Sequence, residues 1–332
     1  MENIRSMDSH ASGYKAIPFI PVFLLVLLLA FPALSVEGAA NGLALWFQVV
    51  LPTLAPFMIC TQMIVGLGGV SLLIRPVYPF LYAVFRLSPS GSYVLLCGLL
   101  CGYPLGARLC ADFYERGELS SEEARYLLSI CNHPSPMFLL GFIRGLLPFP
   151  IPGFLLPLCL YLPILPISWI SRRRYGFSGS AHVSGMHASA TKGITLESIL
   201  LSTAETMVLI GNYMMLFSIL AVWIWRIPLL PDSFKALLSG IAEITTGIRQ
   251  ICQVYPPDQI LLPAAAVTAF GGLSGLFQTK GILSSVSDPR CGAQKNAGLS
   301  IRHYVLWKLL HAGLTCLILV TAENLLRQLP HL

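Results

Sequence analysis

The sequence has few charged residues. Only 11% of its 332 residues are Asp, Glu, Lys or Arg, against about a quarter in soluble domains. Hydrophobic residues make up 55% of the chain, and the mean hydropathy is +0.73. Because a membrane span needs about 20 mostly apolar residues, this balance predicts an all-α, multi-pass membrane protein. Long apolar runs lie at 17–36, 39–70, 91–111, 136–170, 198–227, 259–277 and 301–322.

The sequence also lacks the motifs of several enzyme and cofactor classes. Its nine cysteines include no Cys-x-x-Cys pair, which argues against a zinc site or a disulfide framework. A Ser/His/Asp constellation, a His-Glu-x-x-His motif and a phosphate-binding glycine loop do not stand out. We therefore expect no enzyme activity, no catalytic residue, no metal site and no cofactor.

The first apolar run is open to two interpretations. Ile17 to Leu34 resembles the hydrophobic region of a signal peptide, but it is longer than the usual ~7 to 15 residues and the cleavage site after it is only a passable one. We favour a retained helix. Residues 1–38 then form an N-terminal tail and a first transmembrane helix.

A polar stretch divides the rest of the chain into halves. Residues 171–197 are rich in Ser, Gly, Ala and His, and they read as a linker between a first repeat at 39–170 and a second at 198–325. Arg172, Arg173 and Arg174 place this linker in the cytoplasm by the positive-inside rule. A patch that binds anionic lipid or nucleic acid is the less common cause of such a cluster, and we expect no nucleic-acid partner. The basic stretch 290–308 indicates a second cytoplasmic loop.

Each half contains an apolar segment broken by glycine or proline. Gly102-Tyr103-Pro104-Leu105-Gly106 in the first half corresponds to Gly271-Gly272-Leu273-Ser274-Gly275 in the second. We expect the first helix to stop before Pro104 and to restart near Gly106. A second break at Asn132-His133-Pro134-Ser135-Pro136, and a re-entrant hairpin with its tip at Pro52 and Pro56, complete the expected set.

Broken helices in a membrane have two explanations. Unpaired backbone groups survive at membrane depth only where protein or a water-filled cavity satisfies them, and paired breaks in two halves are typical of a transporter site near the midplane. The N-terminus of a restarted helix also favours an anion. Glycine and proline are, however, common in membrane helices as kinks and packing positions.

Ionisable and polar residues near the breaks are candidates for ligand contact. Glu205 and Glu243 lie in apolar surroundings, where such residues usually face a bundle interior, although Glu243 also suits an exposed place on an interfacial helix. Arg108 and Lys280 either meet a substrate or extend to the membrane interface, and His133 is either a ligand or a turn residue. The candidate substrate-binding residues are Gly102, Tyr103, Pro104, Gly106, Arg108, Asn132, His133, Ser135, Glu205, Glu243, Gly271, Gly272, Ser274 and Gln278.

The acidic segment between the first two breaks reads as a short amphipathic helix at the membrane surface. Ser120 or Ser121 is the expected N-cap of this helix, and Glu122 and Glu123 lie in its first turn. A favourable interaction with the helix dipole explains these carboxylates without catalysis.

The stretch GYPLGARLCADFYERGELSSEEARYLLSICNHPSPMFLLGF, together with GIAEITTGI and FGGLSGLFQ, resembles the YlbJ-type sporulation integral membrane proteins. This family is also called stage V sporulation protein V and falls in the nucleoside recognition or Gate-domain group. The resemblance covers most of 42–320 and implies two repeats with re-entrant hairpins and discontinuous helices, similar to concentrative nucleoside transporters.

The resemblance also implies a function. The family is thought to move dipicolinic acid from mother cell to forespore across the outer forespore membrane during endospore formation. We therefore expect a transporter of a small anionic metabolite in a bacterial membrane, with homo-oligomers or other sporulation membrane proteins as further partners. The alternatives are a nucleoside-type transporter and a non-transporting Gate-domain scaffold in spore assembly.

Overall fold

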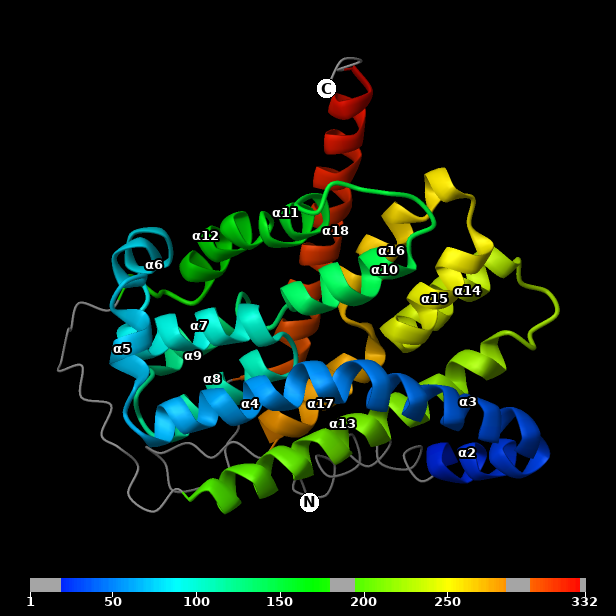
Figure 1. The fold of residues 1–332 in the computed structure, drawn as a ribbon, viewed down its shortest axis with the longest axis horizontal. Coiled ribbons are helices and arrows are strands. Elements are labelled where there is room, and N and C mark those ends of the chain that lie inside the picture. The colour runs from blue at the N-terminus through cyan, green and yellow to red at the C-terminus, as the bar shows by residue number, and fades with distance from the viewer. Residues whose placement is uncertain (1–18, 180–194, 285–298, 329–332) are drawn as a thin grey trace, which may run out of the picture.

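The computed structural model describes residues 19–179, 195–284 and 299–328, and every regular element in these ranges is a helix (Figure 1). The elements before the central gap are α2 (Phe19–Ala30), α3 (Pro32–Leu45), the π-helical η1 (Trp46–Val50), α4 (Leu51–Gly66), α5 (Val70–Ile74), α6 (Tyr78–Phe85), α7 (Pro89–Cys101), α8 (Leu105–Glu115), α9 (Ser121–Leu128), the π-helical η2 (Phe138–Ile143), α10 (Arg144–Leu146), α11 (Leu155–Tyr161) and α12 (Ile164–Arg174). The elements after it are α13 (Leu196–Ile224), α14 (Asp232–Ala242), α15 (Ile244–Val254), the 3-10 helix η3 (Pro257–Gln259), α16 (Leu261–Phe270), α17 (Gly272–Ser284) and α18 (Ile301–Gln328).

Five helical stretches in the described residues are long and apolar enough to cross a membrane. A sixth results if α6 and α7, which meet at a 95° bend, are counted as one broken span. The expectation of an all-α, multi-pass membrane protein is thus confirmed. The five stretches are Pro32–Gly66, Leu155–Arg174, Leu196–Ile224, Pro257–Ser284 and Ile301–Leu325.

The N-terminal third departs from the expected hairpin at Pro52 and Pro56. Helices α3, η1 and α4 form one continuous helical stretch of 35 residues, so the hairpin expectation is wrong. A proline removes one backbone donor from a helix. Just after the π-helical turn, the Thr53 hydroxyl donates to the Val49 carbonyl at 2.6 Å, which is a common way of satisfying carbonyls near a proline in a membrane helix.

The expected segment boundaries also shift. Helix α2 has 12 residues, shorter than a span, and α3 begins at Pro32, inside the expected first transmembrane helix. Helix α12 continues through the three arginines to Arg174, so the first residues of the expected linker are helical. Residues 180–194 of that linker lie outside the described residues.

Helix α13 lies along α3 and α4 through a small-residue contact (Figure 1). Gly38 and Gly42 are four residues apart on α3, and a Cβ at Gly38 would lie 2.7 Å from the Ile219 Cα. At Gly42 it would lie 2.8 Å from the Ser218 Oγ. Small residues at this spacing let the backbones of two membrane helices approach closely.

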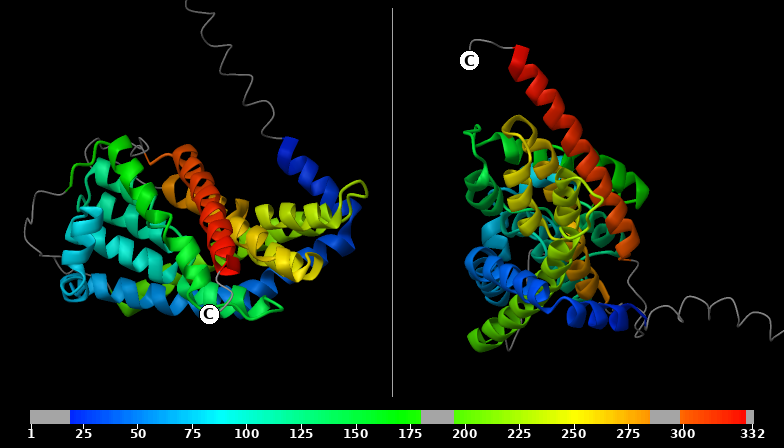
Figure 2. Two further views of the ribbon diagram at one scale, coloured as in Figure 1. Left: turned by 90° about the horizontal axis from the view of Figure 1, so that it is seen from above. Right: turned by 90° about the vertical axis from the view of Figure 1, so that its right-hand side faces the viewer.

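Helices α14 and α15 form a tight hairpin that packs on α13 and α16. A Cβ on Gly247 would lie 2.0 Å from the Gly240 Cα, so the two helices touch backbone to backbone. Helix α18 packs along α16 and crosses the molecule, with its C-terminal end projecting beyond the other helices (Figure 2).

Helix α9 confirms the expected helix in the acidic segment. The Ser120 Oγ accepts from the Glu123 backbone N–H at 3.1 Å, which makes Ser120 the N-cap. The Glu123 carboxylate is buried and accepts from the Ser88 N–H at 2.7 Å at the start of α7. Burial raises the pKa of this carboxyl group, and its hydrogen bonds with Ser88 oppose the rise.

The buried apolar side chains form two clusters. One is built mainly from α4 to α9 with part of α13, and the other from α11, α14, α15 and α16. Leu54, Ile210 and Met214 belong to the first cluster, and Ile244 belongs to the second. All four line one cavity, so this cavity lies between the two packed parts of the protein.

Candidate substrate site

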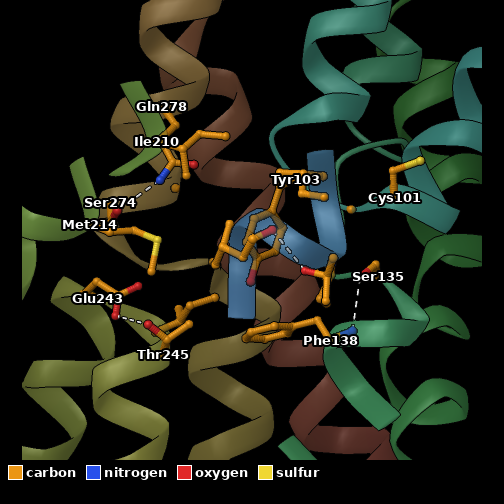
Figure 3. A pocket seen from close by; sticks show the side chains of 18 residues that line it. Cys101, Tyr103, Ser135, Phe138, Ile210, Met214, Glu243, Thr245, Ser274 and Gln278 are labelled. Atoms are coloured by element: carbon orange, nitrogen blue, oxygen red, sulfur yellow. Dashed lines mark hydrogen bonds between the residues drawn. The ribbon is translucent and has the colours of Figure 1, made fainter. Parts of the chain in front are cut away.

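The cavity lies where the turn between α7 and α8, the turn between α14 and α15, and the break between α16 and α17 meet. Its enclosed volume is about 60 Å³, and the empty space reaches about 580 Å³ when the open side is included. Its walls are mostly apolar, with a few polar groups directed inward (Figure 3). The lining residues are Val50, Thr53, Leu54, Cys101, Gly102, Tyr103, Pro134, Ser135, Phe138, Ile210, Met214, Glu243, Ile244, Thr245, Gly271, Ser274, Gly275 and Gln278.

The first break separates α7 from α8 as expected. Gly102 ends α7 with φ of 88°, a conformation that favours glycine, and α8 starts at Leu105. The Tyr103 backbone N–H donates to a carbonyl outside its own helix, that of His133, at 3.1 Å. This bond joins the break to the Asn132–Pro136 segment, where the Ser135 Oγ accepts from the Phe138 N–H at 3.2 Å.

The second break separates α16 from α17. Gly271 ends α16 with φ of 90°, and α17 starts at Gly272. Ser274 and Gln278 lie one turn apart on α17, and the Gln278 Nε2 donates to the Ser274 Oγ at 3.1 Å (Figure 3). A Cβ on Gly275 would lie 4.0 Å from the Tyr103 ring, so the two breaks face each other.

Glu243 supplies the third interruption, between α14 and α15. Its Oε2 accepts from the Thr246 N–H at 2.8 Å and from the Thr245 hydroxyl, so the side chain caps α15 (Figure 3). Only 2% of the residue is exposed. The alternative of an exposed place on an interfacial helix is therefore wrong. Among the described residues that line the cavity, Glu243 is the only one with a carboxylate.

Seven of the fourteen expected site residues do line this cavity, namely Gly102, Tyr103, Ser135, Glu243, Gly271, Ser274 and Gln278. Pro104, Gly106 and Gly272 belong to the breaks but are not in the lining. Arg108 points elsewhere, toward the Thr206 hydroxyl and to within 4.0 Å of Asp112. Glu205 is exposed on α13. These positions follow from helix rotation, which places neighbouring residues on different faces.

Asn132 and His133 lie behind the cavity wall and are buried. The Asn132 Oδ1 accepts from the Ala107 N–H at 3.3 Å near the start of α8. Its Nδ2 donates to the Thr279 hydroxyl at 3.2 Å and to the Tyr304 hydroxyl at 2.7 Å. The Asn132 side chain therefore links α8 to α17 and α18 by hydrogen bonds.

Replacing Asn132 by Ala is expected to lower the free energy of unfolding by roughly 2–3 kcal/mol, because the substitution leaves buried donors and acceptors without partners. Unfolding of the purified protein in mixed detergent micelles measures this loss. Asn212→Ala is the matched control, since Asn212 is exposed on α13. Equal stabilities of the two variants would show that the Asn132 bonds contribute little.

The sequence interpretation missed a polar face of α18. Tyr304, Lys308, His311 and Thr315 are all buried, and their spacing places them on one face of the helix. The signal in the sequence was a set of polar residues at i, i+4, i+7 and i+11 in an apolar run. The expectation that 290–308 forms a cytoplasmic loop is wrong from Ile301 onward, where α18 begins, and residues 290–298 lie outside the described residues.

Comparison with known proteins gives one informative relationship. The chain is similar to the sporulation integral membrane protein YlbJ of Bacillus subtilis (strain 168), with 28% identity over 307 residues that cover 79% of this chain and 74% of that protein. This similarity supports membership of the YlbJ family. No protein-family model and no solved structure matches it. Twelve of the eighteen residues that line the cavity lie in the segments that resemble this family.

Proposed function

We propose that the protein transports a small anionic metabolite, with dipicolinic acid as the candidate substrate. The observation that carries this proposal is the cavity itself. It is built from helix interruptions in a multi-pass membrane protein, and such interruptions are typical of substrate sites in secondary transporters.

The lining offers groups that suit a planar aromatic dicarboxylate. Tyr103 and Phe138 provide ring surfaces for stacking. The Gln278 amide and the hydroxyls of Ser135 and Ser274 provide hydrogen-bond donors. Helix α17, which starts beside the cavity, adds backbone N–H groups and the positive end of a helix dipole.

The relationship to YlbJ supports a membrane role in sporulation. Dipicolinate transport from mother cell to forespore, through the outer forespore membrane, is our proposal for that role. An architecture of two Gate-like repeats, similar to concentrative nucleoside transporters, is part of the same proposal.

Glu243 favours a second candidate function. A carboxylate accepts hydrogen bonds well from neutral donors such as sugar hydroxyls, and it repels a carboxylate substrate. Nucleoside transport through the same cavity is therefore the alternative. A non-transporting scaffold would need no ligand in the cavity at all.

Uptake into proteoliposomes that contain the purified protein tests the proposal. We expect saturable uptake of radiolabelled dipicolinate above that of protein-free vesicles. Uptake of uridine instead would favour the nucleoside alternative. If neither compound enters and neither binds to the folded protein, the transport proposal is wrong and the scaffold interpretation stands.

A further inference from the structure

Lys308 is a buried basic residue with no carboxylate beside it in the described part of the chain. Only 2% of this residue is exposed. Among the described residues, the Lys308 Nζ has no ion-pair partner within 4.0 Å, and Glu243 is not one either. The Nζ donates a hydrogen bond of 3.4 Å to the Asn132 carbonyl and lies 5.7 Å from the centre of the Tyr103 ring.

Two histidines lie next to Lys308 and supply no negative charge. Both ring nitrogens of His311 face backbone carbonyl oxygens, Ala269 at 3.1 Å and Leu160 at 2.7 Å. A neutral imidazole donates to only one of two such acceptors. The His133 ring lies 4.3 Å from the His311 ring, and both its nitrogens are buried without a hydrogen-bond partner in the described part of the chain.

A lysine in such surroundings calls for a counter-charge. An isolated ammonium group in an apolar interior is strongly unfavourable, so the amine stays neutral until an anion pairs with it. Ionisable residues within membrane segments are rare, and they usually mark substrate or ion pathways. Hydrogen bonding to one carbonyl at 3.4 Å does not replace an anion.

Lys308 does not line the cavity, but it lies beside Gly271, which does. Gly271 lines the cavity, and a Cβ at this position would lie 3.4 Å from the Lys308 Cε and 3.8 Å from its Nζ. Because Gly271 has no side chain, that residue places only backbone atoms between the Lys308 amine and the cavity. Tyr103 forms the neighbouring part of the wall, and its buried hydroxyl has no partner among the described residues.

We propose that Lys308 is the counter-charge for an anionic group of the ligand in this cavity, reached past Gly271 and Tyr103. This inference rests on the proposed function and deepens it. Lys308 offsets the repulsion from Glu243, orients a carboxylate toward α18, and makes the site selective for anions over neutral nucleosides.

Ligand-induced thermal stabilisation of the purified protein in detergent tests the inference without requiring transport. The probes are dipicolinate and benzoate as anions, with uridine as the neutral compound. We expect both anions to stabilise the unmodified protein. In Lys308→Met, which keeps an unbranched apolar side chain, we expect the apparent Kd for each anion to rise by roughly thirtyfold or more, because a desolvated charge pair is lost.

Lys280→Met is the matched control, because Lys280 is exposed on α17 over the Phe277 ring. It removes one positive charge without touching the cavity, and its anion affinity should stay as in the unmodified protein. Lys308→Met should fold at least as well as the unmodified protein, since it removes a buried amine that has no counter-charge. The melting temperature of Lys308→Met without ligand checks this. A second variant, Lys308→Arg, can still carry the positive charge and should retain anion binding in part.

The outcomes separate this inference from the proposed function. Equal anion affinity in Lys308→Met and the unmodified protein would overturn the role of Lys308, whatever the uptake assay shows. Absence of anion stabilisation in the unmodified protein would overturn it as well. Anion binding that depends on Lys308 without any dipicolinate uptake would support the inference and contradict transport.

Discussion

Gly275→Val is expected to reduce dipicolinate uptake by roughly tenfold or more, which corresponds to about 1.4 kcal/mol or more of lost binding free energy. Gly275 lines the cavity, and a Cβ added at this position would have the Tyr103 ring as its nearest neighbour, at 4.0 Å. A valine therefore enters space that the substrate would occupy, and it meets no backbone on the way.

The measurement is initial uptake into proteoliposomes, compared at equal amounts of inserted protein. Gly313→Val is the matched control, because Gly313 is exposed on α18 with nothing within 4 Å of its Cβ position. The melting temperature of Gly275→Val should stay close to that of the control. Unchanged uptake in a correctly inserted Gly275→Val protein would place the substrate path outside this cavity.

Gly106→Ala is expected to be among the most destabilising single substitutions in the protein. A Cβ at this position would lie 2.0 Å from the Cys131 carbonyl oxygen and 2.7 Å from its carbonyl carbon. Overpacking in a rigid interior usually costs about 1–3 kcal/mol, and here the clash is with backbone, which cannot rotate away as a side chain does. We expect a loss at or above the upper end of that range.

Yield of monodisperse protein and its unfolding midpoint in detergent measure this effect, with Gly313→Ala as the control. The two glycines therefore answer different questions, although they lie in corresponding breaks. A substitution at Gly106 tests packing against the Cys131 backbone, whereas one at Gly275 tests occupancy of the cavity. A stable Gly106→Ala protein would show that α8 can shift away from Cys131.

The helix breaks were predictable because they depend on local chemistry. Proline cannot donate a backbone hydrogen bond, and glycine accepts positive φ, so Pro104, Gly102 and Gly271 marked the interruptions correctly. The same local reasoning was wrong at Pro52 and Pro56. There both prolines lie within one long helix, just after a π-helical turn.

The cavity lining was predictable only in part. Tyr103, Ser274 and Gln278 were found because they lie within or next to the breaks. Lys308 was assigned to a loop because basic residues precede it, yet it lies in the second turn of α18 and is buried by the Asn132 segment and α16. Its burial depends on contacts between residues far apart in the chain, which local patterns do not report.

Composition and apolar run length by themselves determined that this is a multi-pass helical membrane protein, because spanning a bilayer sets the number and kind of residues in each segment. Glycine and proline determined two of its interruptions. Only the tertiary structure decided which polar groups share a cavity. Rotation of each helix and close packing at glycines brought Glu243, Tyr103 and Gln278 to one cavity and turned Arg108 and Glu205 away.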